Sequence, residues 1–131
     1  MLSRLTILAL SCLGLSCLAL LCLGANAQAA NPRDGIWIIE GTTDQGECPK
    51  TFTGEIEVRG DDIVGAASLN NAPVQARVVG AIDKTNEIWS RLTGAAGVAR
   101  GVGKIKGDAA SGAWSSNTAY CGGRWKARRK K

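Results

Sequence analysis

The chain has 131 residues, with 16 Lys and Arg against 11 Asp and Glu and a net charge of +5 at neutral pH. This length is enough for one domain with a modest core of its own. The sequence contains no histidine, which removes the commonest general base and the commonest metal ligand. We therefore expect no metal ion and no cofactor.

Residues 1–27 have the pattern of an export signal that is cleaved from the mature protein. Arg4 is the only early charge, residues 5–23 are uncharged and rich in Leu, Ala and Cys, and Ala25-Asn26-Ala27 supplies small residues for a signal peptidase. An uncleaved membrane anchor is an alternative, since this run of about 19 residues at about 1.5 Å each would nearly cross a bilayer core. Lipidation at Cys17 or Cys22 is a weaker alternative because the residues before both cysteines depart from the usual pattern.

Beyond residue 27 the pattern is typical of an all-β protein. The whole chain has 17 Gly and 3 Pro, and short alternating runs are separated by turn residues at intervals of roughly 8 to 12 residues. We expect strands near residues 35–42, 51–59, 62–68, 73–82, 86–92, 98–106, 112–116 and 120–129. The expected turns lie at 60–61, 70–73, 83–85, 94–97, 107–108 and 117–118, and the longest loop covers 43–50.

Eight short strands joined by tight turns predict a single small antiparallel meander, which hides its edges best by closing into a barrel. We place the β-barrel domain at residues 28–125 and a basic C-terminal tail at 126–131. After cleavage, 15 basic and 11 acidic residues remain, a net charge of +4, and six of the basic residues lie in 124–131.

Alternation along the strands predicts which side chains face the barrel interior. The expected inward sets are Phe52, Gly54, Ile56 and Val58; Val74, Ala76, Val78, Gly80 and Ile82; Ala99, Gly101, Gly103 and Ile105; and Cys121, Gly123, Trp125 and Ala127. Trp37, Trp114 and Trp125 are the expected large fillers, whereas Trp89 shares its face with Glu87 and Arg91 and is expected to be exposed. A narrow barrel filled by its own side chains fits this pattern better than a ligand cavity does.

Cys48 and Cys121 are the only cysteines outside the export segment. In an oxidising compartment two such cysteines are expected to pair, which ties the 43–50 loop to the last strand. A redox or metal-binding role is disfavoured because the pair has neither a C-x-x-C spacing nor a histidine beside it. The disulfide is therefore predicted to be structural.

The sequence shows no recognisable catalytic motif. Gly101-Val102-Gly103 lies in a predicted strand and is followed by no helix, so it is not a phosphate loop. Asp61-Asp62 is expected to be solvated at a turn, and Glu55 and Glu57 are expected on the outer face of a strand. We expect no catalytic residue and no enzymatic activity.

The one distinctive surface feature is basic. Its candidate anion-binding residues are Arg100, Lys104 and Lys106 on the sixth predicted strand, and Arg124, Lys126, Arg128 and Arg129 at the end of the chain. In a meander the two rows lie two strands apart, about 10 Å across. Such a patch attracts polyanions, namely lipid headgroups, acidic polysaccharide or nucleic acid. The alternative is that these charges only keep the sheet soluble and free of edge association.

Several motifs of the chain together form a recognisable pattern. They are Asp34-Gly35-Ile36-Trp37, Cys48, Arg100-Gly101-Val102-Gly103-Lys104-Ile105-Lys106-Gly107, Ser111-Gly112-Ala113-Trp114 and Cys121-Gly122-Gly123-Arg124-Trp125-Lys126-Ala127-Arg128. This pattern resembles a group of small secreted, glycine-rich β-domain proteins of alphaproteobacteria, and residues 60–95 match it only loosely. The group has no assigned activity, so the resemblance implies an exported, disulfide-linked β-domain and no catalytic residue.

Three functions remain open for an exported protein, periplasmic or secreted. The first is a non-catalytic binding module whose basic face meets an anionic envelope component. The second is a small-barrel inhibitor of an exported hydrolase, acting through the 43–50 loop or the segment before Trp37. The third is a barrel that binds a small ligand inside. No specific nucleic acid is expected as a partner, and a membrane only if the N-terminal segment stays uncleaved.

Overall fold

The computed structural model describes residues 31–69 and 75–131, which form eight β-strands. The strands are β1 (Gly35–Gln45), β2 (Thr51–Arg59), β3 (Asp62–Leu69), β4 (Gln75–Ile82), β5 (Glu87–Gly94), β6 (Gly97–Lys106), β7 (Ala109–Ser116) and β8 (Cys121–Arg129). The predicted export signal, the expected turn at 70–73 and Val74 lie outside the described residues. No helix in the described part of the chain has the length and apolar character needed to span a membrane.

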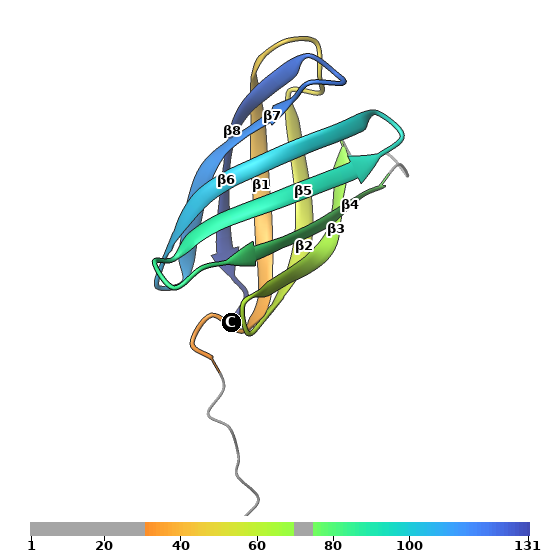
Figure 1. Ribbon diagram of the computed structural model, residues 1–131. Helices are drawn as coiled ribbons and strands as arrows, with labels where there is room; N and C mark the ends of the chain where they lie inside the picture. Colours follow the sequence, from red (N-terminus) through yellow and green to blue (C-terminus); the bar gives the residue numbers. More distant parts are fainter. Residues whose placement is uncertain (1–30, 70–74) are drawn as a thin grey trace, which may run out of the picture.

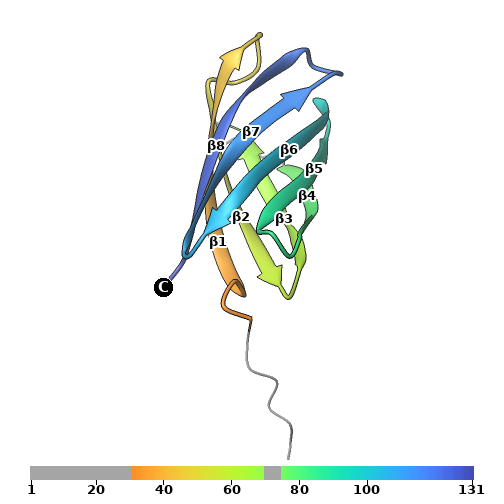
Figure 2. The ribbon, with the colours of Figure 1, turned by 60° about the vertical axis from the view of Figure 1, so that its left-hand side comes forward.

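The strands form a closed antiparallel meander barrel, as the sequence predicts (Figure 1). Each strand pairs with the next along the chain, and β8 pairs with β1 to close the cylinder. Figure 2 shows the barrel turned about its vertical axis, with β6, β7 and β8 following one another around the wall. Closure leaves no sheet edge free, which removes the main route by which a small sheet associates with other chains.

The strand boundaries differ from the prediction mainly at the tight turns. β7 begins at Ala109, not at residue 112, because Gly107 takes a φ of 58° and reverses the chain within two residues. Ala109 then pairs directly with Lys106. β1 extends to Gln45, and the shift in its register with β8 between Thr43 and Gln45 marks a bulge.

The strand expected at residues 120–129 is confirmed, and it includes residues 126–129, which we also assigned to a basic tail. β8 continues to Arg129, and its last residues pair with β1 from Glu40 back to Trp37. The strand reaches Arg129 because β1 offers it backbone partners from Trp37 onward. Lys130 and Lys131 follow the strand.

The interior follows the predicted alternation. Trp37, 1% exposed, lies at the centre of a cluster of buried aliphatic side chains from every part of the wall. Its indole nitrogen donates a hydrogen bond of 2.9 Å to the Arg33 carbonyl oxygen. Trp114 and Trp125 are partly buried, and Trp114 packs edge-on against Phe52 with ring centroids 5.5 Å apart. Trp89 lies on the outside, as expected, and is 56% exposed.

The barrel interior is filled by its own side chains. One cavity of about 50 Å³ lies among Trp37, Ile56 and their neighbours, and a second of about 90 Å³ lies at the end that carries Cys48 and Cys121. Small-molecule sites usually occupy about 300 to 1,000 Å³. These interior cavities therefore offer no space for a ligand of ordinary size.

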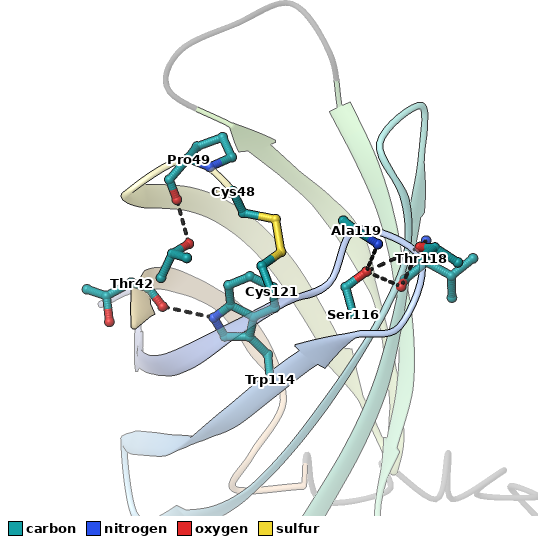
Figure 3. Close-up of a disulfide and its surroundings, with 10 residues drawn as sticks. Thr42, Cys48, Pro49, Trp114, Ser116, Thr118, Ala119 and Cys121 are labelled. Carbon is teal, nitrogen blue, oxygen red and sulfur yellow. Dashed lines mark hydrogen bonds between the residues drawn. A yellow bond between two sulfur atoms is a disulfide. The ribbon is translucent and has the colours of Figure 1, made fainter. Parts of the chain in front are cut away.

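Cys48 and Cys121 form the predicted disulfide, with Cα atoms 6.0 Å apart (Figure 3). The bridge joins the connection between β1 and β2 to the first residue of β8. Trp114 lies beside it and donates from its indole nitrogen to the Thr42 carbonyl oxygen at 3.0 Å. Disulfides of this kind are typical of proteins exported to an oxidising compartment.

Candidate anion-binding face

The outward side chains of β6, β7 and β8 lie in register across the barrel wall. Two such rows are Lys104–Ser111–Lys126 and Lys106–Ala109–Arg128. In each row a cation from β6 and a cation from β8 lie on either side of a small side chain from β7, two strand spacings or about 10 Å apart. Nothing bulky separates the cations, so one anionic group or chain can reach both.

We define the basic face as the outward cations of these strands, namely Arg100, Lys104, Lys106, Arg124, Lys126 and Arg128. All six are exposed. Alternation placed them correctly on the outside of their strands, and the order of strands in the barrel brings the two rows together as expected. Whether they bind an anion stays a prediction.

The β8 row of the basic face is partly neutralised by β1. Arg124 donates from Nε to the Asp44 carboxylate at 2.8 Å, and the Lys126 amine lies 3.1 Å from a Glu40 carboxylate oxygen. The hydrogen bond from Arg124 lowers the pKa of Asp44 below its ordinary value and raises that of Arg124 itself. The sequence alone did not reveal these partners, because β1 becomes a neighbour of β8 only when the barrel closes.

Arg129 does not share the basic face. It has the opposite alternation from Arg128, pairs with Trp37, and its guanidinium lies 2.7 Å from the Asp108 carboxylate. The same guanidinium donates to the Pro32 carbonyl oxygen at 2.7 Å. Arg129 therefore fastens the segment before β1 to the end of β8, which is a structural role.

The cations of the β6 row have fewer carboxylate partners than those of the β8 row. Arg100, Lys104 and Lys106 take part in none of the ion pairs formed between described residues. Lys104 lies opposite Glu87 of β5. The pKa of Asp83 is lowered by hydrogen bonds from the Thr85 hydroxyl and from the backbone amides of Glu87 and Thr85; desolvation opposes this, and the charge of Lys104 adds to the lowering.

The structure adds residues that sequence analysis did not select. Arg91 of β5 lies directly opposite Arg100, and the exposed Trp89 lies directly opposite Val102. Alternation gave the sequence signal that Trp89 and Arg91 face outward. It gave no signal of which β6 residue each one meets, because that depends on the register between two strands.

The basic face offers electrostatic contacts to a partner, and the exposed Trp89 and Val102 beside it add apolar ones. Within 31–69 and 75–131 no group of three or more His, Cys, Asp or Glu side chains is placed to hold a metal ion. No protein-family model matches the chain, and no curated protein matches it.

Proposed function

We propose that the protein is an exported, non-catalytic β-barrel module, periplasmic or secreted, that binds an anionic component of the cell envelope through its basic face. The observation that carries this proposal is the register of β6, β7 and β8. It sets cations from two strands on either side of a lane of Ala and Ser side chains. A polyanion lying in that lane contacts both rows at once.

The ion pairs of the β8 row do not oppose such binding strongly. Arg124 and Lys126 are 77% and 71% exposed at the side chain, and their partners Asp44 and Glu40 are also solvent-accessible. Exposed ion pairs contribute about 0 to 1 kcal/mol. A ligand with several anionic groups can therefore displace these carboxylates, and the release of its counterions makes the binding fall with added salt.

The proposal is tested by retention of the purified protein on immobilised heparin in a salt gradient. Replacing Lys104, Lys106 and Arg128 by Gln removes two cations from the β6 side of the lane and one from the β8 side. We expect this variant to elute at a clearly lower salt concentration than the unmodified protein. The matched control replaces Lys50, Arg59 and Lys84 by Gln, which removes the same charge from exposed positions elsewhere.

The control variant is expected to elute closer to the unmodified protein than to the Lys104/Lys106/Arg128 variant. Equal shifts for both variants would mean that only net charge governs retention, and the basic face would then have no special role. No retention of the unmodified protein at physiological salt would contradict the proposal outright.

A further inference from the structure

The wall beside the basic face carries two arginines that face one another. Arg91 and Arg100 are register partners on β5 and β6, and both side chains are exposed. Like charges directly opposite each other in an antiparallel pair destabilise it. Neither guanidinium takes part in an ion pair with a described carboxylate. The arginine pair therefore holds two positive charges close together. An anionic group bound between them would reduce their mutual repulsion.

A third arginine adds to this charge. Arg77 of β4 is exposed and pairs with Thr93, the residue two positions beyond Arg91 on β5. Arg77 and Arg91 are therefore diagonal neighbours, at roughly 7 to 8 Å between their backbone positions. Three adjacent strands thus present guanidinium groups, and guanidinium binds carboxylate or sulfate through two parallel hydrogen bonds.

An apolar strip runs next to the arginine pair. Its members are register partners across four strands, namely Ala81, Trp89, Val102 and Ala113. Trp89 and Val102 are 56% and 58% exposed, and because they are register partners they form one contiguous apolar patch, the kind of surface that marks an interaction site. The strip spans three strand spacings, about 14 Å, and lies two residues, about 7 Å, from the arginine pair.

We propose that an acidic polysaccharide binds across β4, β5 and β6, with one sugar ring on the indole of Trp89 and its carboxylate or sulfate groups on Arg91 and Arg100. This inference rests on the proposed function, since it names the class of the anionic partner. A sugar ring has one face of C–H groups that packs on an indole, while its acidic substituents project from the ring edge. An apolar strip bordered on one side by arginines matches that division.

Two other polyanions fit the wall less well. Single-stranded nucleic acid usually stacks successive bases on successive aromatic side chains. Trp89 is the only large aromatic exposed on the outer wall among the described strands, and Tyr120 lies in the turn before β8. A bilayer surface favours aromatic side chains that project at one end of a protein, whereas Trp89 is the third residue of β5 and is bordered by charges.

The binding test uses the purified protein with alginate, a polymer of uronic acids, and with dextran as a neutral polysaccharide. Affinity is measured by calorimetry, and tryptophan fluorescence is recorded in parallel. Two variants address the site: Arg91→Gln with Arg100→Gln, and Trp89→Ala. The control variant is Lys50→Gln with Lys131→Gln, which removes the same charge as the double arginine variant at exposed positions outside β4, β5 and β6.

We expect alginate to bind, dextran not to bind, and each site variant to weaken alginate binding about tenfold, which corresponds to about 1.4 kcal/mol. The control should change affinity less than threefold. Alginate should also shift the fluorescence of the unmodified protein, and Trp89→Ala should abolish the shift although three other tryptophans remain. Trp89→Phe should restore part of the affinity, and unchanged circular dichroism shows that each variant is folded.

The possible failures are distinguishable. If the unmodified protein binds neither heparin nor alginate, the proposed function itself is wrong. If it binds heparin through the basic face but Trp89→Ala and the double arginine variant bind alginate normally, the polysaccharide site is wrong and the basic face stands. Tighter binding to a single-stranded oligonucleotide or to phosphatidylglycerol vesicles than to alginate would also overturn this inference.

Discussion

The packing of Trp125 shows how one large side chain in this narrow barrel limits the size of the residue beside it. Its indole lies beside Gly103 of β6, and its ring nitrogen donates to the carbonyl oxygens of Val102 at 3.1 Å and Ala113 at 3.2 Å. A Cβ atom at Gly103 would meet both the indole and the Ser111 carbonyl oxygen. The glycine is therefore required by the close approach of both the Ser111 carbonyl oxygen and the indole, and not by its backbone torsion angles.

The substitution Gly103→Ala is expected to lower the free energy of unfolding by about 1 to 3 kcal/mol, because the added methyl group overpacks a rigid site. Urea denaturation followed by tryptophan fluorescence measures the change. Ser111→Ala, on the outward face of the neighbouring strand, is the control and should change stability by no more than about 0.5 kcal/mol. A Gly103→Ala protein as stable as the control would show that the indole moves aside freely.

At the scale of elements, β8 is the strand on which the barrel depends most directly for closure. It pairs with β7 on one side and with β1 on the other, and Ala127 in its second half is 4% exposed. Its outward cations belong to the basic face, so the same strand closes the core and presents charge. Removing the C-terminal charges by truncation would therefore also damage the fold.

Deletion of residues 126–131 is expected to abolish the cooperative thermal transition, because half of β8 is lost and β1 and β7 are left with unpaired backbone groups. Deletion of residues 130–131 alone should keep the transition within a few degrees, since it removes one backbone hydrogen bond, from Lys130 to Ile36. Circular dichroism during heating measures both. A six-residue deletion that melts like the intact protein would contradict the role assigned to β8.

For the whole molecule, closure has two separate sources. The backbone pairing of β1 with β8 completes the cylinder, and the disulfide ties the connection after β1 to the start of β8. The disulfide spans 73 residues of sequence. A cross-link over so long a loop acts mainly by limiting the unfolded chain.

Replacing Cys48 and Cys121 by Ala is expected to lower the free energy of unfolding by about 2 to 4 kcal/mol and to leave the barrel folded. Guanidinium denaturation gives the stability, and circular dichroism reports the strands. The unmodified protein in the presence of a reducing agent is the control and should have a similar midpoint. Loss of the β-sheet signal in the double variant would show that strand pairing alone does not hold the barrel closed.

The sequence by itself determined the number of strands, the faces of those strands that alternate clearly, and the disulfide. Alternation with a period of two is local, so it identified Phe52, Ile56 and Val58 as inward and Trp89 as outward without any knowledge of neighbours. Turns that contain Gly, Asn or Asp divided the chain into strands for the same local reason. The cysteine pair followed from there being only two cysteines outside the export segment.

Only the tertiary structure decided which outward side chains meet. The register between β5 and β6 brings Arg91 opposite Arg100, and closure of β8 onto β1 brings Asp44 to Arg124. These features depend on contacts between distant segments, and a shift of two residues in register would keep every inward face while changing every outward neighbour.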